Sequence, residues 1–378
     1  MTTDSEKLKP HKQKCSLLIS SLSGGGAEGV CVTVANGLAE LGWQVELVVL
    51  HLNDAVHLAR VSEQVTLVNL NVLQARYVFK PLRQYLRIAA PDKVLAFNYE
   101  LTMATVLIRG LYGFKFDLIA RNINTISRNM QSYGRSVKGR IFSILLKSLY
   151  KKADFVINQS QGMQQDLLAC MPQFAGRCSV INNPVSPIYE HLSDDFLLSD
   201  KAAEHYILCV GRLEQQKAFH QAISAFSEIA AEFPLLRLKF VGKGSLEQAL
   251  QLQAQQLGIA DRVDFAGFHQ QLLPFYKNAQ LTLLTSLYEG FPNVLVESIS
   301  CGTAVVSVDC PSGPAEIIQP GINGVLVRKG ESIAQALRTV LQLPCYTDAL
   351  KVKATAQPFT QIAILRRYEQ VLNNVDNR

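Results

Sequence analysis

Apolar residues along the chain fall into short runs that alternate with longer segments of helical periodicity. Polar residues rarely interrupt these runs, and runs so uniformly apolar suit strands that are covered on both faces. The pattern of the first half therefore predicts a parallel sheet wrapped by helices. The runs are Cys15–Leu22, Gln44–Leu52, Val65–Asn71, Lys93–Asn98, Phe116–Arg121, Asp154–Gln159 and Ser179–Asn182.

The same alternation resumes after residue 204. Helical segments such as Ala218–Phe233 and Leu246–Leu257 follow the strands there. Two βα arrays in series, each with right-handed crossovers, predict an α/β fold of two facing, doubly wound, Rossmann-like domains with the ligand at the carboxyl ends of the strands. The second set of runs is His205–Gly211, Leu236–Val241, Arg262–Phe265, Leu281–Thr285, Ala304–Val308 and Gly324–Val327.

The breaks in this pattern set the expected domain boundaries. We expect a flexible tail over residues 1–14, a first domain over 15–184, and a second domain over 205–358. The stretch 185–204 contains Pro187 and an acidic, serine-containing patch, so it is interpreted as an interdomain linker. Residues 359–378 carry apolar positions at near-helical spacing and predict an amphipathic helix that packs back on the first domain.

Composition narrows the class of protein. Hydrophobic residues make up 48% and charged residues 18% of the 378 positions, as in globular proteins. No apolar run approaches the roughly 20 residues of a membrane-spanning helix, and Met1–Lys14 lacks a hydrophobic signal core, so a cytoplasmic protein is expected. The eight cysteines are scattered without metal-ligand spacing, and we interpret most of them as buried apolar residues.

Positive charge is concentrated in the first half. Residues 1–184 hold 21 Lys/Arg and 12 Asp/Glu, whereas residues 185–378 hold 16 and 19. The segment Arg121–Lys152 has eight basic residues and no acid. Such a face could meet phosphates, anionic lipid or nucleic acid. Because no RNA-binding signature, zinc spacing or helix-turn-helix pattern is found, nucleic acid is not an expected partner, although a basic nucleic-acid-binding protein remains an alternative.

A glycine cluster follows the first strand. Gly24, Gly25 and Gly26 lead into a helix, and their backbone amides could bind an anion at the helix start. An ordinary glycine-rich turn explains the cluster equally well. A P-loop is excluded because no Gly-Lys-Ser/Thr follows.

Two basic residues follow the first strand of the second domain. Gly211 and Arg212 leave that strand, and Lys217 comes just before the next helix. A guanidinium fork and a mobile ammonium at this spacing could clamp a diphosphate. Solvated loop residues are the alternative.

Two carboxylates bracket a turn in the second domain. Glu289 precedes a Gly-Phe-Pro turn, Pro292 is placed to begin a helix, and Glu297 lies about one turn into it. Two acids placed in this way can accept hydrogen bonds from several hydroxyls of a sugar-bearing ligand. A helix-dipole partner and a solvated helix face would be the alternative roles.

At these residues the chain resembles glycosyltransferase family 4, retaining enzymes of the GT-B fold with an E-x7-E signature. Glu289 and Glu297 stand at that spacing. The resemblance covers nearly the whole chain and extends to further motifs in the same order. These are the Gly-Gly-Ala-Glu start of the first helix, Gly211-Arg212 with Lys217, Val241-Gly242-Lys243-Gly244, and Gly267-Phe268.

The resemblance implies a role for each motif. Glu297 would hold the ribose hydroxyls, Glu289 the transferred sugar, and Arg212 with Lys217 the diphosphate. The backbone of the stretch Phe291, Pro292, Asn293 and Val294 would help to position sugar and phosphate. Gly25 and Gly26 would let the first-domain helix approach the phosphate, and Gly242 and Phe268 would lie near the base. The first domain would bind the acceptor and the second the nucleotide sugar.

One departure concerns the glycine motif. Many similar sequences read Gly-Gly-Ala-Glu-Arg, whereas Gly29 stands here in place of the arginine. Any role of that arginine must be absent or supplied by another residue. Arg121-Asn122, at the end of a first-domain strand, matches a pair in similar sequences and is a candidate for the acceptor side or the cleft.

The expected reaction is transfer from a nucleotide diphosphate sugar, with UDP as the commonest nucleotide among similar proteins, to a glycan or polyprenyl-linked acceptor with retention of configuration. The departing phosphate can take the acceptor proton, so no cofactor and no metal are expected. The context implied is bacterial surface polysaccharide or lipopolysaccharide synthesis, with the basic segment lying on an anionic membrane. A nucleotide-sugar 2-epimerase of the same fold is the alternative enzyme, and a phosphorylase would need a pyridoxal-binding lysine that the sequence does not indicate.

Overall fold

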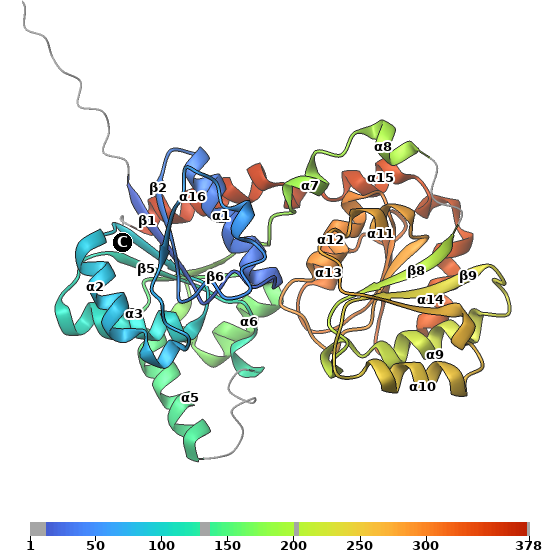
Figure 1. Cartoon of the computed structure of the whole chain (residues 1–378), viewed down its shortest axis with the longest axis horizontal. Helices are drawn as coiled ribbons and strands as arrows, with labels where there is room; N and C mark the ends of the chain where they lie inside the picture. The colour runs from blue at the N-terminus through green and yellow to red at the C-terminus, as the bar shows by residue number, and fades with distance from the viewer. Residues whose placement is uncertain (1–12, 129–136, 200–203, 376–378) are drawn as a thin grey trace, which may run out of the picture. The chain divides into compact units, whose positions relative to one another are not determined.

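The computed structural model describes residues 13–128, 137–199 and 204–375. The chain divides into two compact units (Figure 1). The first takes the described residues of Met1–Asn158, Gln164–Ile181 and Leu365–Arg378, and the second takes Gln159–Met163 and the described residues of Asn182–Ile364. Of the predicted tail over 1–14, residues 1–12 lie outside the described part, and Lys14 already begins the first strand.

The first unit is built on a seven-stranded parallel sheet in the order β3-β2-β1-β4-β5-β6-β7. Each apolar run predicted from the first half overlaps one of these strands, and β1 and β7 each begin one residue before the predicted run. In β1 and β2 all six residues pair, from Lys14 opposite Gln44 to Ile19 opposite Val49. The strands are β1 (Lys14–Ile19), β2 (Gln44–Val49), β3 (Thr66–Asn69), β4 (Lys93–Ala96), β5 (Asp117–Arg121), β6 (Phe155–Asn158) and β7 (Cys178–Val180).

Helices cover both faces of this sheet. On one face α2, α3 and α5 share a buried core with the strands. On the other, α16 packs against α1, where a Cβ at Gly37 would lie 2.2 Å from Leu365 Cδ1. The helical segments are α1 (Gly26–Glu40), η1 (Leu58–Arg60), η2 (Ala75–Tyr77), α2 (Phe79–Ala89), α3 (Tyr99–Tyr112), α5 (Val137–Tyr150), α6 (Gln161–Cys170), η3 (Pro172–Phe174) and α16 (Gln361–Asn374).

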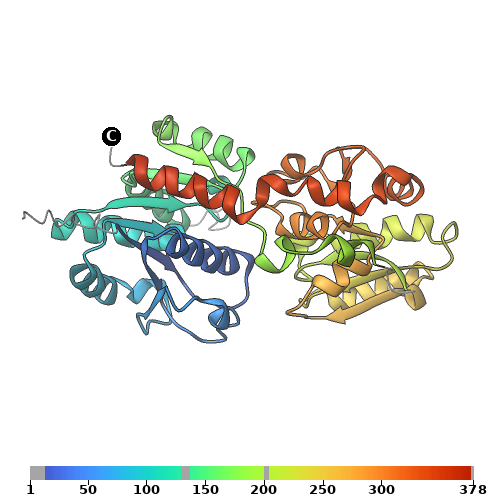
Figure 2. The same ribbon diagram turned by 90° about the horizontal axis from the view of Figure 1, so that it is seen from above.

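The last helix is tied to the sheet by a buried arginine. In Figure 2, α16 is drawn in red beside the label C and lies over the first unit. Arg121, the final residue of β5, is 1% exposed and its Nε donates to the Tyr368 hydroxyl at 2.6 Å. The guanidinium also lies 4.9 Å from the Phe97 ring centroid. Burial raises the pKa of the Tyr368 hydroxyl, so that hydroxyl stays neutral.

Arg121 and Asn122, the candidates for the acceptor side or the cleft, are both buried in the first unit. Asn122 is as buried as Arg121, accepts a hydrogen bond from the Tyr150 hydroxyl at 2.5 Å and donates to Asn158 at 2.7 Å. Both side chains are occupied by neighbours within the first unit. They hold β5, β6, α5 and α16 together and present no polar atoms at the surface.

The second unit has a six-stranded parallel sheet in the order β10-β9-β8-β11-β12-β13. Strands are added on one side from β8 to β10 and on the other side from β11 to β13, so the order of the strands reverses between β8 and β11. The predicted runs and the two predicted helices are confirmed to within a few residues. The strands are β8 (His205–Val210), β9 (Leu236–Val241), β10 (Val263–Gly267), β11 (Leu281–Leu284), β12 (Val305–Val308) and β13 (Gly324–Val327). The helical segments are α7 (Pro187–Glu190), α8 (Asp194–Leu198), η4 (Gln215–Lys217), α9 (Phe219–Ile229), α10 (Glu247–Gln256), η5 (Ala260–Arg262), α11 (Leu273–Asn278), α12 (Asn293–Ser300), α13 (Pro314–Ile317), α14 (Ile333–Gln342), η6 (Pro344–Tyr346), α15 (Ala349–Ala354) and η7 (Gln357–Phe359).

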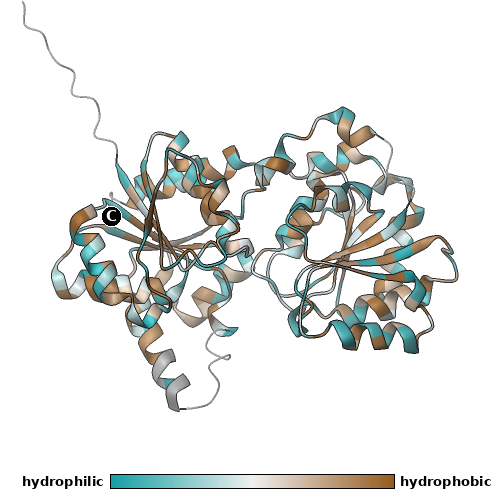
Figure 3. Cartoon of the chain, in the orientation of Figure 1, coloured by the Kyte–Doolittle hydropathy of each residue, from teal (hydrophilic) through white to brown (hydrophobic). Residues whose placement is uncertain are grey.

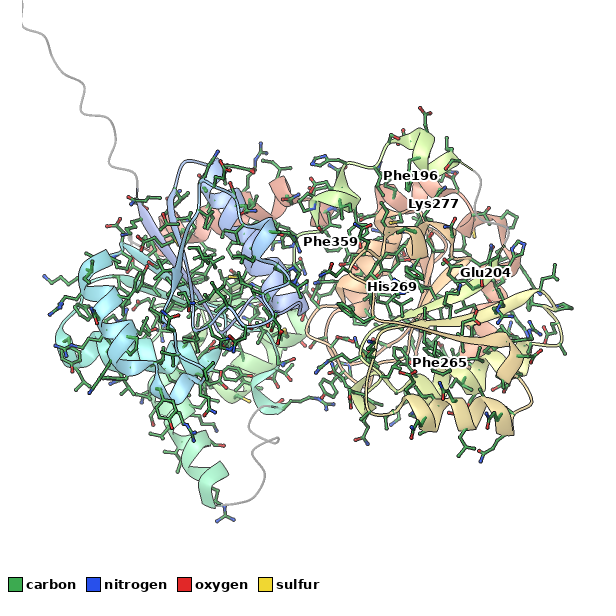
Figure 4. The ribbon with its side chains drawn as sticks, in the orientation of Figure 1. Phe196, Glu204, Phe265, His269, Lys277 and Phe359 are labelled. Atoms are coloured by element: carbon green, nitrogen blue, oxygen red, sulfur yellow. The ribbon has the colours of Figure 1, made fainter. Side chains whose placement is uncertain are left out.

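The stretch 185–204, expected to link the domains, belongs instead to the second unit as far as it is described. It forms α7 and α8, and buried Lys277 fixes α8 by donating to the carbonyl oxygens of Leu197 and Ser199, both at 2.7 Å. Its ammonium also lies 5.6 Å from the Phe196 ring centroid, and both residues are labelled in Figure 4. Apolar and cationic contacts therefore order a segment whose composition suggested a linker.

Hydropathy follows the layers of each unit. In Figure 3 the strands are largely brown, whereas the helices carry teal and brown residues in alternation. All eight cysteines are free, and five of them are buried, which confirms the interpretation that most are packing residues. Burial raises the pKa of the Cys15 thiol to about 12. In the part of the chain that the structure describes, no helix has the length and apolarity needed to cross a bilayer.

Replacing Tyr368 with Phe should destabilise the first unit. The change removes the hydroxyl that accepts a hydrogen bond from Arg121 Nε in a buried setting, so we expect a loss of about 1–3 kcal/mol in urea unfolding. Tyr112→Phe, at an exposed ring of the same unit, is the control and should stay within about 0.5 kcal/mol of the parent. Equal unfolding midpoints for both variants would contradict the role given to this hydrogen bond.

Candidate functional site

The candidate site of the second unit lies where its strand order reverses. The loop after β8 carries Gly211, Arg212 and Lys217, and the loop after β11 carries Glu289. In open α/β sheets, ligands bind beside the carboxyl ends of strands at such a switch point. The two loops are joined by backbone contacts, since Leu287 N donates to Gln216 O at 2.8 Å.

An ion pair joins the same loops through side chains. Lys217 Nζ donates to Glu289 Oε1 at 2.7 Å, and Ser286 Oγ donates to the same oxygen at 2.6 Å. The side chains of Lys217 and Glu289 are only 16% and 10% exposed. No described residue donates a hydrogen bond to Glu289 Oε2, so one oxygen of an oriented carboxylate is available to a hydroxyl. Arg212 is exposed beside them.

Glycine makes this arrangement possible. Gly211 has φ of +148°, and a Cβ there would lie 2.8 Å from Lys217 Cε. The lysine side chain therefore passes over Gly211 on its way to Glu289. A larger residue at position 211 would displace the ammonium.

A second glycine brings the neighbouring loop close. Gly242, after β9, also has φ of +148°, and a Cβ would lie 1.9 Å from the carbonyl oxygen of Gly211. Its amide donates to Gly267 O at 2.8 Å, which connects the loop to the end of β10. Gly211 and Gly242 thus make backbone contacts that place three strand ends side by side.

Phe268 extends from the end of β10 with 56% of its surface exposed. Two neighbouring rings contact other aromatic side chains. The Phe265 ring stacks on Phe240 at 5.1 Å, and the His269 ring lies 4.8 Å from Phe275, as the labels in Figure 4 help to locate. The exposed ring of Phe268 is accordingly open to a planar ligand.

The second carboxylate is oriented by a tyrosine that sequence reasoning missed. Glu297 lies in the second turn of α12 and accepts from the Tyr276 hydroxyl at 2.8 Å. Tyr276 is fully buried, and burial together with the Glu297 charge holds the pKa of its hydroxyl well above the usual range, so it acts as a donor. The only sequence signal was a Tyr in an apolar helical segment, which more often indicates core packing.

At the start of α12, side chains are buried and no N-cap side chain accepts a hydrogen bond from the first backbone amides. Phe291 is buried with its ring 5.4 Å from Phe359, and Pro292 is the N-cap without a side-chain hydrogen bond. Asn293 Oδ1 accepts from Asn183 Nδ2 at 2.7 Å. Phe291 therefore contributes through its backbone, and the first amides of α12, Asn293 and Val294 among them, are the groups placed to meet an anion.

In the first unit, Gly25 is the N-cap of α1 and Gly26 its first residue. No side chain caps this helix. Gly24 has φ of +87°, so the turn itself requires glycine at that position. These residues belong to a different unit from Glu289 and Glu297.

A side chain from another segment lies over Gly29, where similar sequences carry arginine. A Cβ at Gly29 would be 3.3 Å from Arg60 Nη1 and 3.4 Å from His57 Cε1. Arg60 is held by Thr33 Oγ1 at 3.2 Å and by His57 Nδ1 at 3.1 Å. Burial, and then the Arg60 charge, lower the pKa of His57, so the imidazole is neutral and can accept from Arg60. No local motif marks Arg60, because it reaches α1 from 31 residues away in the sequence.

Because the loop at Gly242 closely approaches Gly211, replacing Gly242 with alanine should lower the stability of the protein more than replacing Gly258 with alanine. Gly242→Ala combines a conformation nearly confined to glycine with a 1.9 Å backbone clash, so we expect at least about 3 kcal/mol of destabilisation. Gly258→Ala, with φ of +69° and open space around its Cβ, should cost about 1 kcal/mol. Urea unfolding measures the free energy of unfolding of both variants. Similar decreases in the two variants would show that the close approach to Gly211 does not add to the effect of alanine at position 242.

Known proteins resemble this chain along most of its length. Residues 197–357 match the family model for glycosyl transferases group 1, and residues 24–188 match that for glycosyltransferase family 4. A Campylobacter jejuni protein named N-acetylgalactosamine-N,N'-diacetylbacillosaminyl-diphospho-undecaprenol 4-alpha-N-acetylgalactosaminyltransferase is 27% identical over 94% of this chain and 98% of its own. The lipopolysaccharide 1,6-galactosyltransferase of Salmonella typhimurium is 34% identical over 47% of this chain and 49% of its own.

Solved structures show the same fold. The lipopolysaccharide outer core galactosyltransferase WaaB in its apo form has a TM-score of 0.74 at 22% identity, covering 96% of this chain and 99% of that chain. The Anabaena protein HepE in complex with UDP and glucose has a TM-score of 0.77 at 21% identity, with the same coverage. These likenesses confirm the predicted GT-B fold. The two family models, which between them match most of the chain, and the similarity to the Campylobacter jejuni protein show that the chain belongs to glycosyltransferase family 4 and is a glycosyltransferase.

Proposed function

We propose that this glycosyltransferase moves a sugar from a UDP-sugar to a hydroxyl of a lipid-linked or glycan acceptor during the synthesis of a bacterial surface polysaccharide or lipopolysaccharide, with retention of the anomeric configuration. The observation that carries this proposal is the oriented pair Glu289 and Glu297 beside Lys217 at the switch point of the second sheet. The relatives named as acting on undecaprenol-linked and lipopolysaccharide acceptors support the acceptor class.

The donor would be held by groups with matching chemistry. Glu297, fixed by Tyr276, would accept from the ribose hydroxyls, and Phe268 with the Gly242 loop would lie beside the base. An ammonium has three donors, so Lys217 can keep Glu289 as a partner and still donate to a diphosphate. Arg212 and the first amides of α12 would add further donors to the same diphosphate.

These residues suit a retaining transfer. Glu289 Oε2 would accept from a hydroxyl of the transferred sugar and so orient its anomeric carbon. The acceptor oxygen then attacks from the side of the departing diphosphate, the bond from the anomeric carbon to the phosphate oxygen breaks, and the leaving phosphate takes the acceptor proton. Lys217 and Arg212 stabilise the negative charge that develops on that phosphate, and no metal has a part in this scheme.

The first unit would contribute the acceptor side. Arg60 over Gly29 places a cation at the first turn of α1 and would take the role of the arginine that similar sequences carry at position 29. The basic residues that follow buried Arg121 in the acid-free segment Arg121–Lys152 would contact anionic lipid near a lipid-linked acceptor. Residues 129–136 of that segment lie outside the described part of the chain.

Calorimetry with UDP and uridine, in the presence of EDTA, tests the donor site. Glu297→Gln should lower the affinity for both ligands by about tenfold to a hundredfold, because both contain the ribose. Lys217→Gln should weaken UDP by a similar factor and leave uridine unchanged. Glu228→Gln, at an exposed carboxylate of α9, is the matched control and should bind as the wild type does. Unchanged UDP affinity in both site variants would overturn the assignment, and preference for GDP or ADP would correct the nucleotide.

The stereochemistry of the product tests the mechanism separately. With an α-configured UDP-sugar, the vicinal coupling of the anomeric proton in the product should show an α-linkage, at a rate that EDTA does not change. A β-linked product would contradict retention. Loss of turnover in EDTA, restored by magnesium ion, would contradict a metal-independent reaction.

A further inference from the structure

One helical layer of the first unit presents a continuous outer face. The helices α2, α3 and α5 bury Leu82, Ile108 and Leu146, among others, in the same core against the sheet. Helix α3 packs against both α2 and α5, as can be followed in Figure 1. Their opposite sides therefore form one surface that belongs to a single unit.

Large apolar side chains project from this surface. Ile88 is 71%, Leu111 68% and Ile144 64% exposed, and Leu107, Tyr112 and Leu145 are exposed as well. Leu107 and Leu111 are one turn apart on α3, so they form a stripe along that helix. None of these side chains is needed to fill the core beneath. Clustered exposure of this kind marks an interaction surface.

The charge around the stripe is almost entirely positive. The three helices contain seven Lys/Arg and a single acid, Glu100. Of the acids in the adjoining loops, Asp154 pairs with one of these seven residues, Arg109, and Asp117 pairs with Lys93 of β4. Among the described residues no carboxylate forms an ion pair with Lys80, Arg87 or Lys147 in this layer.

Tyrosines stacked with arginines border the same surface. The Arg83 guanidinium of α2 lies 4.0 Å from the ring centroid of Tyr112 at the end of α3, and Arg76 lies 4.8 Å from that of Tyr77 in η2. A ring with an apolar body and a polar tip beside a cation suits the headgroup level of a bilayer.

We propose that the outer face of α2, α3 and α5 docks on the surface of an anionic phospholipid bilayer. Leu107, Leu111 and Ile88 enter the boundary between headgroups and acyl chains, while Lys80, Arg87 and Lys147 contact lipid phosphates. A polyanion such as RNA would use the cations but gains nothing from the aliphatic stripe, so a lipid surface is the occupant that the whole face fits. The proposal rests on the lipid-linked acceptor of the proposed function and names the surface that brings the enzyme to it.

Co-sedimentation with vesicles tests this surface on the full chain. The probes are vesicles of phosphatidylcholine alone and of phosphatidylcholine mixed with phosphatidylglycerol. One variant, Leu107→Gln with Leu111→Gln, removes the apolar stripe and keeps the charge. A second, Lys80→Gln with Arg87→Gln, removes charge and keeps the stripe. Leu252→Gln with Leu257→Gln replaces two exposed leucines of the second unit and is the matched control.

The wild type and the control should bind the mixed vesicles and leave phosphatidylcholine unbound. Each of the two surface variants should lower the partition coefficient for mixed vesicles by about tenfold. No vesicle binding by the wild type would overturn the proposal. It would also be overturned if the leucine variant bound as the wild type does, or if short RNA competed with vesicles and only the charge variant lost binding.

Calorimetry with UDP on the same variants separates this proposal from the donor assignment. Both surface variants should bind UDP with wild-type affinity, which also shows that they are folded. Loss of vesicle binding with intact UDP binding supports the docking surface. Intact UDP binding with no vesicle binding by the wild type overturns the docking surface and leaves the donor site in place.

Discussion

The ion pair between Lys217 and Glu289 is the contact on which the candidate site depends. It joins the loops that follow β8 and β11, the two strands between which the sheet reverses its order. Because both side chains are largely buried, their attraction is screened less than that of a surface pair. This single contact fixes the orientation of both the Glu289 carboxylate and the Lys217 ammonium. Ser286 adds a hydrogen bond to the same carboxylate oxygen.

Backbone geometry supplies the second constraint. The Lys217 side chain reaches Glu289 only because Gly211 has no Cβ in its path, and Gly211 in turn is approached by Gly242 from β9. Both glycines have positive φ values, at which a residue with a Cβ would meet a steric penalty. The glycines of these motifs therefore support the charged side chains of the site.

The two units use buried polar groups in different ways. In the second unit, Tyr276 lies beneath Glu297 and leaves the carboxylate half-exposed at the site. In the first, Arg121 is covered by Tyr368 and Phe97, and its charge serves to join the last helix to the sheet. Packing thus decides whether a charged side chain supported by a tyrosine is covered, as Arg121 is, or left partly open, as Glu297 is.

The sequence by itself determined the strands, most helices, the fold class and the positions of the E-x7-E motif, because periodicity, turn residues and motif spacing are local properties of the chain. Tertiary structure alone decided the burial of Arg121 and Asn122, the order of the stretch 185–204, the support of Glu297 by Tyr276 and the placement of Arg60 over Gly29. Each of these depends on partners that are brought together only by folding, such as Arg121 and Tyr368, which lie 247 residues apart. Local patterns give the type of side chain available, whereas packing against distant segments determines whether that side chain is covered, oriented or left open to a ligand.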